Sequence, residues 1–333
     1  MKYKRIVISH YGDPEVLQVV EDELQEPRPG EVRVKILAAG VAWGDILKRS
    51  GLGTGVRPPF TPGYDIVGKV ERLGDDVSSV KVGQMVAALT VFGGYAEYIC
   101  LPASELVQVP SDLDPAQAVC LVMNYVVAYQ MLYRAASVKP GERVLIQSAA
   151  GGVGTALLQL GQLAKLEIYG TASSGKHELI ASLGGAPIDY KKEDFVERVF
   201  AMTGDGVDVI FDPIGGTHTW QSYRMLRKGG RLIVYGAHTV IEDGVFKMLL
   251  GSILSSLLNL IPGKRILNYN VTRSKYSTPE WCREDLSKLF VLLAQKKVKP
   301  IIAEQMPLVE AAHAHELLEK GSATGKIVLI CNT

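Results

Sequence analysis

A short run of small residues carries the clearest chemical signal in the sequence. Residues 143–164 read RVLIQSAAGGVGTALLQLGQLA, an apolar run followed by small residues and then by apolar residues at helical spacing. A strand, a tight turn and a helix in this order let a pyrophosphate approach the backbone N–H groups at a helix N-terminus, where a Cβ would block it. Gly151 and Gly154 occupy the second and third glycine positions of G-x-G-x-x-G, and Ala149 stands at the first. The pattern predicts a dinucleotide site, and the alternative is a plain strand-to-helix turn.

The end of the next predicted strand indicates which dinucleotide is bound. In such a fold an Asp or Glu at this point binds the ribose 2′-OH, and its absence admits a 2′-phosphate. The strand ends in YGTASSGK, with no carboxylate before Glu178. Ser173, Ser174 and Lys176 offer two hydroxyls and an ammonium, which suit a phosphate dianion. NADP(H) is therefore favoured, although the serines are also suited to cap the following helix, and both roles are compatible.

Composition limits the classes of protein to be considered. The chain has 333 residues, with 36 Lys and Arg against 35 Asp and Glu and a formal charge of +1. This length allows about two domains, and the balanced charge gives no basic surface for a nucleic acid. The N-terminus MKYKRIVISHYG has no apolar core of signal-peptide length, so a cytoplasmic location is expected. The 4 cysteines form no CxxC pair, which argues against a zinc knuckle or a disulfide framework.

Two patterns of secondary structure divide the chain. Roughly the first 100 residues hold short strands separated by Gly and Asp turns, which suggests a partly closed β domain. Residues 115–135, rich in Ala, Val and Leu, predict one or two helices. Beyond them strands alternate with helices, which is typical of a parallel sheet with right-handed crossovers. The predicted strands are 143–148, 167–172, 186–190, 207–213, 231–236 and 266–271.

The last part of the chain predicts helices over 283–295 and 309–320 and a strand over 326–330. This tail is too short to form a domain, so we expect it to pack back on the N-terminal β region. The most apolar window, residues 245–261, is short and mixed for a membrane span, and a buried or pocket-covering helix is the favoured interpretation. A lid or a membrane-surface role remains open for it.

Several motifs in a fixed order resemble one family. The turn SAAGGVG is followed by GTASSGKHE, PIDYKKEDFVERV, GVDVIFDPIGG and KGGRLIVYG, and LVMNYVVAY precedes it. This series resembles the medium-chain dehydrogenase/reductase superfamily, and within it the zinc-free quinone oxidoreductases, nearest the branch of the vesicle amine transport protein homologue. The resemblance extends from YGDPEVLQV to GKIVL, nearly the whole chain.

The resemblance implies an α/β fold of two domains. A GroES-like, partly open β-barrel catalytic domain would occupy residues 1–123, and a Rossmann domain, a doubly wound parallel sheet that binds NADP(H), would occupy 124–267. Residues 268–333 would return to the catalytic domain. The resemblance also implies a cleft between the domains and a homodimer formed through the edge of the Rossmann sheet.

The resemblance further implies a set of cofactor-binding residues. The turn would hold the pyrophosphate, Lys176 and Tyr190 with Ser173 or Ser174 would surround the 2′-phosphate, and Gly236 and Asn124 would lie near the nicotinamide end. With Lys326 from the C-terminal strand, the whole expected set is Asn124, Ala150, Gly151, Gly152, Val153, Gly154, Ser173, Ser174, Lys176, Tyr190, Gly236 and Lys326.

Zinc can be judged position by position against the zinc-bearing relatives that this family resembles. Those relatives place a Cys in GVCxxD, a His in PGHE and a second Cys in the helix before the Rossmann domain. Here the corresponding residues are Ala42, Tyr64 and Met123. A methyl group, a neutral phenol and a thioether are poor partners for a cation that prefers thiolate and imidazole. The cysteine-rich lobe that binds structural zinc is also missing from residues 89–106, so no metal is expected.

The sequence also departs from the quinone reductases, which usually read GVNFxD and carry a Tyr soon after RxG. Ala42 stands at the Asn position and Gly53 at the Tyr position, while Asp45 is retained. Trp43 and Tyr64 would supply an aromatic wall and a hydroxyl instead, or they serve only in packing. Asp45 and Tyr64 are the candidate catalytic residues, as positioning or proton-relay groups.

These expectations lead to one favoured function and two rivals. The favoured function is hydride transfer from NADPH to a quinone or an α,β-unsaturated carbonyl, an acceptor that delocalises the incoming charge and needs no Lewis acid. The first rival is an NADPH-binding, membrane-associated or regulatory protein of the same fold with little turnover. The second, a zinc alcohol dehydrogenase, is disfavoured by the missing ligands.

Overall fold

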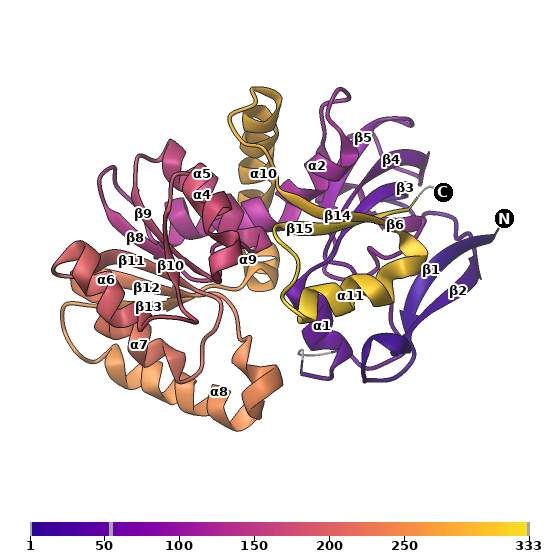
Figure 1. Cartoon of the computed structure of the whole chain (residues 1–333). Coiled ribbons are helices and arrows are strands. Elements are labelled where there is room, and N and C mark those ends of the chain that lie inside the picture. The colour runs from indigo at the N-terminus through magenta and orange to yellow at the C-terminus, as the bar shows by residue number, and fades with distance from the viewer. Residues whose placement is uncertain (1, 53–55, 332–333) are drawn as a thin grey trace. The chain divides into compact units, whose positions relative to one another are not determined.

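The computed structural model of the chain describes residues 2–52 and 56–331 (Figure 1). Gly53, one of the two departures from the quinone reductase pattern, lies outside the described residues. The chain divides into two compact units: unit 1 is Met1–Val126 with Thr272–Thr333, and unit 2 is Val127–Val271. The sequence-based domain limits stood at 123 and 267.

Unit 1 is built on antiparallel strands that enclose an apolar core. Its main sheet has the order β14-β15-β3-β4-β5-β7, with β6 paired to β3, and β1 and β2 form a separate pair. In β3 only Lys35 is exposed, and Glu31 and Leu37 are partly exposed, so the strand, which extends to Gly40, is more buried than the alternating pattern EVRVKIL predicted. The strands are β1 (Lys2–Ile8), β2 (Leu17–Glu23), β3 (Glu31–Gly40), β4 (Asp65–Leu73), β5 (Met85–Leu89), β6 (Tyr98–Pro102), β7 (Val107–Gln108), β14 (Ile302–Pro307) and β15 (Lys326–Ile330).

The two ends of unit 1 meet in this sheet. β15 pairs antiparallel with β3, through Val328 opposite Gly40, and β14 pairs parallel with β15. The helices of this unit are α1 (Trp43–Arg49), α2 (Pro115–Cys120), α10 (Pro279–Ala294) and α11 (Ala311–Glu319), and α9 (Val271–Ser277) begins at its border. α10 starts four residues before the predicted 283 because Pro279 suits the first turn of a helix, where a missing N–H costs nothing.

The apolar segment that follows α2 is a core helix. α2 continues through a π-helical turn at Leu121–Tyr125, α3 (Val126–Tyr129) and a second π-helical turn at Gln130–Ala135. Within the described part of the chain, Pro115–Ala135 is one helical run apolar and long enough to cross a membrane, but 78% of its apolar window is buried inside the protein. Such burial is typical of the central helix of a globular fold.

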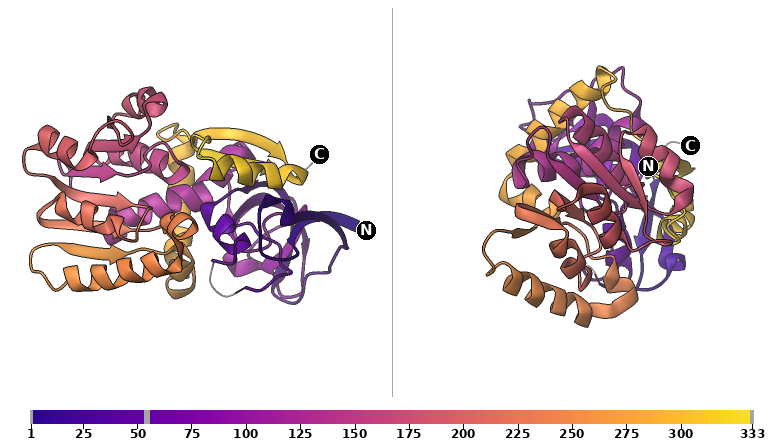
Figure 2. Two further views of the ribbon diagram at one scale, coloured as in Figure 1. Left: turned by 60° about the horizontal axis from the view of Figure 1, so that its bottom comes forward. Right: turned by 60° about the vertical axis from the view of Figure 1, so that its left-hand side comes forward.

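Unit 2 is a parallel sheet with helices on both faces (Figures 1 and 2). The strand order β10-β9-β8-β11-β12-β13 is the 3-2-1-4-5-6 order of a dinucleotide-binding fold. The strands are β8 (Arg143–Ile146), β9 (Glu167–Ala172), β10 (Ala186–Asp189), β11 (Val207–Asp212), β12 (Leu226–Val234) and β13 (Arg265–Asn268). The helices are α4 (Gly152–Leu163), α5 (His177–Ser182), α6 (Phe195–Thr203), α7 (His218–Arg224) and α8 (Thr239–Leu258). The two sheets confirm the expected fold class.

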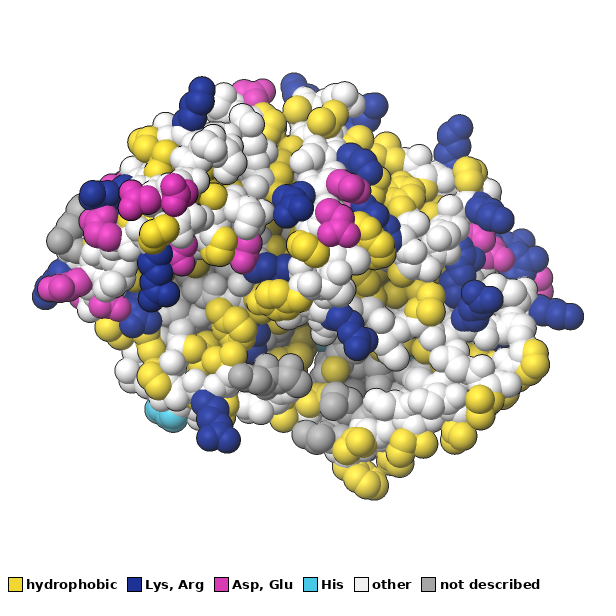
Figure 3. Space-filling view, turned by 180° about the vertical axis from the view of Figure 1, so that it is seen from behind, with side chains coloured by type: hydrophobic (Ala, Val, Ile, Leu, Met, Phe, Trp, Pro, Cys, Tyr) yellow, Lys and Arg dark blue, Asp and Glu magenta, His cyan; other side chains and the backbone are white. Residues whose placement is uncertain are grey.

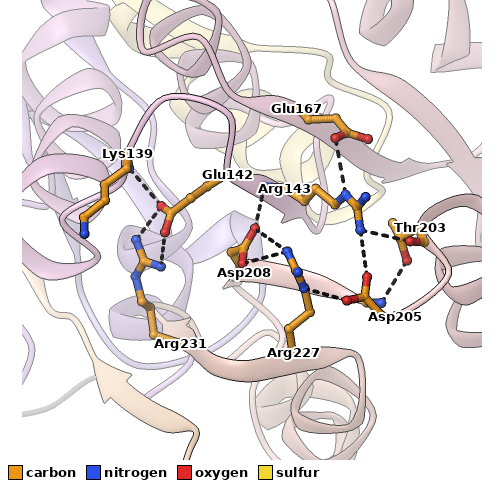
Figure 4. Close-up of polar contacts among 10 residues, drawn as sticks. Lys139, Glu142, Arg143, Glu167, Thr203, Asp205, Asp208, Arg227 and Arg231 are labelled. Atoms are coloured by element: carbon orange, nitrogen blue, oxygen red, sulfur yellow. Dashed lines mark hydrogen bonds and ion pairs between the residues drawn. The ribbon is translucent and has the colours of Figure 1, made fainter.

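Ion pairs join the amino ends of the strands in unit 2 (Figure 4). Arg143, the first residue of β8, contacts Glu167 at the start of β9 at 3.3 Å and Asp205 before β11 at 2.8 Å. Arg231 binds both oxygens of Glu142 at 2.7 and 2.8 Å. Each exposed ion pair contributes about 0–1 kcal/mol to the stability of the fold, so a measurable effect requires several of them together. They hold the end of the sheet opposite to the one that carries the glycine turn.

α8 corrects one part of an expectation: the window 245–261 was expected to be a buried or pocket-covering helix, but most of its described apolar side chains are exposed. Phe246 is 72%, Ile253 55% and Leu257 57% exposed, and Leu249, Leu250, Leu260 and Ile261 are exposed as well. Figure 3 shows hydrophobic side chains along the lower right edge of the molecule, where α8 lies. The helix packs inward through Gly251, Ser255 and Leu258, and a Cβ at Gly251 would lie 2.5 Å from Gly216. We call the seven exposed side chains the α8 stripe.

Candidate functional site

The predicted glycine turn lies at the carboxyl end of β8 and starts α4. Ser148, with a positive φ of 53°, turns the chain away from the sheet. Gly151 is the N-cap residue of α4 and supplies no side-chain hydrogen bond to the first turn. The first N–H groups of this 12-residue helix therefore remain for an anion, and the helix dipole attracts it.

Gly154 explains why the turn needs its last glycine. A Cβ at this position would lie 2.4 Å from the carbonyl oxygen of Ser148 and 2.6 Å from that of Ala149. Both are backbone atoms and cannot move aside, so strand and helix approach closely only because residue 154 has no side chain. Gly154 thus serves the close helix–strand packing that brings the first N–H groups of α4 to the turn.

The carboxyl end of β9 is electropositive. Lys176 closes a 3₁₀ turn, and burial together with the charge of Lys191 lowers its pKa. Ser173 takes the N-cap position of this turn, but its hydroxyl makes no capping hydrogen bond, so the capping role considered from the sequence does not apply to it. Ser174 bonds the Asp189 carboxylate instead.

Lys191 is a residue that the sequence analysis missed. It follows Tyr190, which is 52% exposed just after β10. The Lys191 charge contributes to the lowered pKa of Lys176, and an anion bound near Lys176 would offset this repulsion. The paired lysines of the segment DYKKED were the available signal.

The remaining expected cofactor residues lie in both units. Gly236 follows β12, and a Cβ there would lie 2.2 Å from the Pro213 carbonyl oxygen, so the loops after β11 and β12 touch through backbone. Asn124 belongs to the π-helical turn of unit 1 and is 6% exposed.

Lys326 forms a buried ion pair with Asp65 in unit 1. Its ammonium is 2.9 Å from one Asp65 oxygen and 3.1 Å from the other, and both residues are almost fully buried in unit 1. Gly40 makes room for this pair, since a Cβ there would lie within 2.5 Å of both side chains. The ion pair accounts for the burial of Lys326 without a cofactor.

Asp45 is fully buried and serves as a hydrogen-bond acceptor. Its carboxylate accepts the N–H groups of Ala42 at 3.2 Å and Gly63 at 2.9 Å and the hydroxyl of Tyr95 at 3.3 Å. Burial raises the pKa of Asp45 to about 6, although Lys48 and the Gly63 N–H oppose the rise. The arrangement suits a positioning role, because every contact of Asp45 lies inside unit 1.

Tyr64 is half-buried and lies over Lys48. The Lys48 Nζ is 3.6 Å from the centroid of the Tyr64 ring and 3.7 Å from that of Phe92, a cation–π arrangement. Burial and the Asp45 charge raise the pKa of Tyr64 to about 12, and its hydroxyl bonds Thr272. Gly44 leaves space for this hydroxyl, because a Cβ there would lie 2.7 Å from it.

Lys48 is the second residue that sequence reasoning missed. It donates to the Val91 carbonyl oxygen, and burial lowers its pKa to about 8 despite the charge of Asp45. Its place three residues after Asp45, on the same face of α1, was the available signal.

The residues that correspond to zinc ligands do not fit a metal. Ala42 is the N-cap of α1 and Tyr64 is a phenol whose raised pKa keeps it neutral. Among the described residues, no group of three His, Cys, Asp or Glu side chains is placed to hold a metal ion. Ala42, Tyr64 and Met123 therefore do not supply the thiolate and imidazole donors that zinc prefers.

A GroES-like sheet unit and a 3-2-1-4-5-6 parallel sheet with a glycine turn define a nicotinamide-dependent oxidoreductase. Residues 28–111 match the alcohol dehydrogenase GroES-like domain, and residues 184–329 match the zinc-binding dehydrogenase family. The chain belongs to the medium-chain dehydrogenase/reductase superfamily, in the branch of the quinone oxidoreductases and VAT-1 homologues. It is an oxidoreductase, and its cofactor is NADPH.

Three comparisons support this assignment. The synaptic vesicle membrane protein VAT-1 homolog of Danio rerio is 32% identical over 340 residues, which cover 98% of this chain and 70% of the relative. The quinone oxidoreductase of Homo sapiens is 31% identical over 335 residues, 98% and 97% of the two chains. The solved Escherichia coli quinone oxidoreductase complexed with NADPH superposes with a TM-score of 0.90 at 28% identity and covers 98% of this chain and 99% of that one.

Proposed function

We propose that the protein reduces quinones or α,β-unsaturated carbonyl compounds with NADPH and without zinc. One observation carries the proposal: the residues that correspond to metal ligands are a methyl group, a neutral phenol and a thioether, so no Lewis acid polarises an oxygen. An acceptor that spreads negative charge over its own π-system is suited to such a site. The named quinone oxidoreductases among the relatives favour the same substrate class.

NADPH supplies the hydride, and the residues of the chain bind NADPH and orient the acceptor. The N–H groups at the start of α4 hold the pyrophosphate, and Lys176 with Lys191 attracts the 2′-phosphate. Tyr64 stays protonated at neutral pH because its pKa is about 12, so its O–H donates a hydrogen bond to the acceptor oxygen as negative charge develops there. The Lys48 ammonium beneath the ring stabilises that charge.

The test is steady-state oxidation of NADPH by a panel of quinones, enones, aldehydes and simple ketones, with metal analysis of the same sample. Turnover of quinones or enones by zinc-free protein, with little turnover of simple ketones, is the expected result. Binding of NADPH without turnover on any acceptor would favour the rival, a protein of this fold that binds NADPH and serves in regulation. Activity that depends on bound zinc would contradict the proposal.

Lys176→Ala should weaken the binding of NADPH and leave the binding of NADH unchanged, because only NADPH carries the 2′-phosphate. The loss should be about 10-fold or more, as a hydrogen bond to a charged group contributes about 1.5–3 kcal/mol. Fluorescence titration of both nucleotides measures it. Lys192→Ala is the matched control, since the Lys192 side chain is 72% exposed. An equal loss of affinity for NADH would contradict the placement of Lys176 at the phosphate site.

We also propose a homodimer formed at the edge of the unit 2 sheet. β13 is the edge strand of this sheet, and the Asn259 side chain already binds the Ile266 N–H at 2.7 Å and the Ile266 carbonyl oxygen at 3.0 Å, so the proposed contact relies on apolar surface more than on free strand groups. The α8 stripe belongs to the same unit and, with Leu267 of β13, adds apolar surface of the kind that subunit interfaces cover.

The double variant Ile253→Asp/Leu257→Asp should convert the dimer to a monomer, as light scattering after size exclusion would show. Both side chains are more than half exposed, so the protomer should keep its stability. Val82→Asp, at a 63% exposed position of unit 1, is the control. A wild-type protein that is monomeric and floats with lipid vesicles would instead assign the α8 stripe to a membrane surface.

A further inference from the structure

Four buried polar side chains form a continuous chain inside unit 1. Arg49 Nη1 lies 3.5 Å from His315 Nδ1, His315 Nε2 lies 3.2 Å from the Tyr95 hydroxyl, and that hydroxyl lies 3.3 Å from Asp45. None of the four is more than 1% exposed. At its outer end Arg49 pairs with Glu319 of α11. His315 and Glu319 both belong to α11, and both contact Arg49 of α1. Glu319 lies 270 residues after Arg49 in the sequence.

Chemistry fixes the direction of every hydrogen bond in this chain. A guanidinium only donates, so His315 Nδ1 accepts from Arg49. Burial and the Arg49 charge lower the pKa of His315 to about 3, so the ring is neutral and carries its single proton on Nε2. His315 therefore donates to Tyr95, and Tyr95 donates to Asp45. All protons point toward the carboxylate.

The other contacts of Asp45 hold the backbone next to Tyr64. Asp45 accepts the Gly63 N–H at 2.9 Å. Gly63 has a φ of 113°, and a Cβ there would lie 2.6 Å from Gly94 and from the Tyr95 nitrogen. Tyr95 N in turn donates to the Pro62 carbonyl oxygen at 2.9 Å. The position of Tyr64 thus depends on Asp45 and on the segment that carries Tyr95.

We propose that His315 and Tyr95 are positioning residues that keep Asp45 ionised and thereby hold Gly63 and Tyr64 in the geometry used for reduction. The inference rests on the proposed function through Tyr64, and it adds residues that the site itself does not contain. The charged groups that face Asp45 are Lys48 from its own helix and, from the packed strands, Asp65 and Lys326. Arg49 and Glu319 act on the far end of the chain.

Because of Asp45, a fall in pH should raise the stability of the fold and lower the activity. The Asp45 pKa of about 6 lies above the ordinary value of about 3.9 of an unfolded Asp. Protonation of Asp45 therefore stabilises the fold, an effect complete below about pH 3.9 and lost as the pH rises through 6. Protonation also removes an acceptor for the converging N–H and O–H donors, so kcat/KM should fall below about pH 6 while the protein stays folded.

Tyr95→Phe tests the proposal because it removes one oxygen and keeps the ring. Asp45 then loses a hydrogen bond to its charged form, so the acid limb of kcat/KM should move up by about 0.5–1 pH unit. NADPH affinity should not change, since the glycine turn lies in unit 2. Tyr98→Phe, on a ring that packs edge-on against Tyr3, is the control and should leave the limb in place.

Two variants of His315 separate positioning from packing. A glutamine can accept from Arg49 with its oxygen and donate to Tyr95 with its amide, so His315→Gln should keep the acid limb within about 0.3 pH unit, below the shift for one lost hydrogen bond. His315→Leu should move it as Tyr95→Phe does. Nitrogen NMR of His315 should show a neutral ring protonated on Nε2. A proton on Nδ1, or an unmoved limb in Tyr95→Phe, would overturn the proposal.

A further measurement keeps this inference distinct from the proposed function. If the wild-type protein turns over no quinone or enone, the proposed function fails and no kinetic limb exists. Carbon NMR of the Asp45 carboxyl group then reports its pKa directly. A higher Asp45 pKa in Tyr95→Phe and His315→Leu, but not in His315→Gln, would still support the hydrogen-bond chain, and equal values in all four proteins would refute it.

Discussion

Gly154→Ala should nearly abolish NADPH binding and destabilise unit 2. Alanine normally gains about 1 kcal/mol over glycine inside a helix. Here the new Cβ would lie 2.4 and 2.6 Å from two backbone carbonyl oxygens, so the strand and the helix must separate. Overpacking of this kind costs about 1–3 kcal/mol, which exceeds the gain. The displaced N–H groups should lower NADPH affinity by about 100-fold, at about 1.5–3 kcal/mol for each charged hydrogen bond lost.

Urea unfolding and fluorescence titration with NADPH measure the two effects. Gly175→Ala is the matched control, because nothing lies within 4 Å of a Cβ at Gly175 and the residue is just before Lys176. Gly151→Ala should be intermediate, since its Cβ would meet one carbonyl oxygen at 3.3 Å. If Gly154→Ala binds NADPH as tightly as Gly175→Ala does, the turn is not the pyrophosphate site.

Lys326→Met should be the most destabilising single change in unit 1. It leaves the Asp65 carboxylate, which is 0% exposed, without its only ionic partner at 2.9 Å among the described residues. Removal of one member of a buried ion pair costs about 3–5 kcal/mol. The double variant Asp65→Leu/Lys326→Met should recover most of this loss, because two apolar side chains need no partner.

The same variants decide between two roles for Lys326. If it serves only in the ion pair, the double variant should bind NADPH as the wild type does. If it contacts the cofactor, as expected from the sequence, the double variant should be stable and bind NADPH weakly. Denaturant unfolding and NADPH titration of all four proteins complete the cycle, and a stable Lys326→Met single variant would contradict the structural argument.

The fold was predictable because its signals are local. Alternation in β3, apolar spacing in α4 and the glycines of the turn each act within a few residues, and the strand order follows from the β-α repeat. β12 begins five residues before the predicted 231, since Leu226 pairs with Val207 beyond a bulge that no sequence pattern marked. The expected ends of the other strands differ less.

The surroundings of the site were less predictable because its contacts join distant residues. Asp45 was recognised by its motif, but Tyr95, which donates to it, and His315, which bonds Tyr95, lie 50 and more than 200 residues further on. The apolar window 245–261 was expected to be a buried or pocket-covering helix, and the buried interpretation was wrong for most of its described side chains. Hydropathy shows that a segment avoids water but does not show whether its own chain covers it.

The discontinuity of unit 1 has a consequence for the order in which the chain becomes structured. β3 is translated early, but its neighbour β15 comes from residues 326–330, and β14, which pairs with β15, comes from residues 302–307. Unit 2 uses one uninterrupted stretch, Val127–Val271, and has all its strands before β14 is synthesised. On the ribosome the NADPH-binding half can therefore be complete while the β3 edge is still open, and the first 126 residues must wait for the last strands.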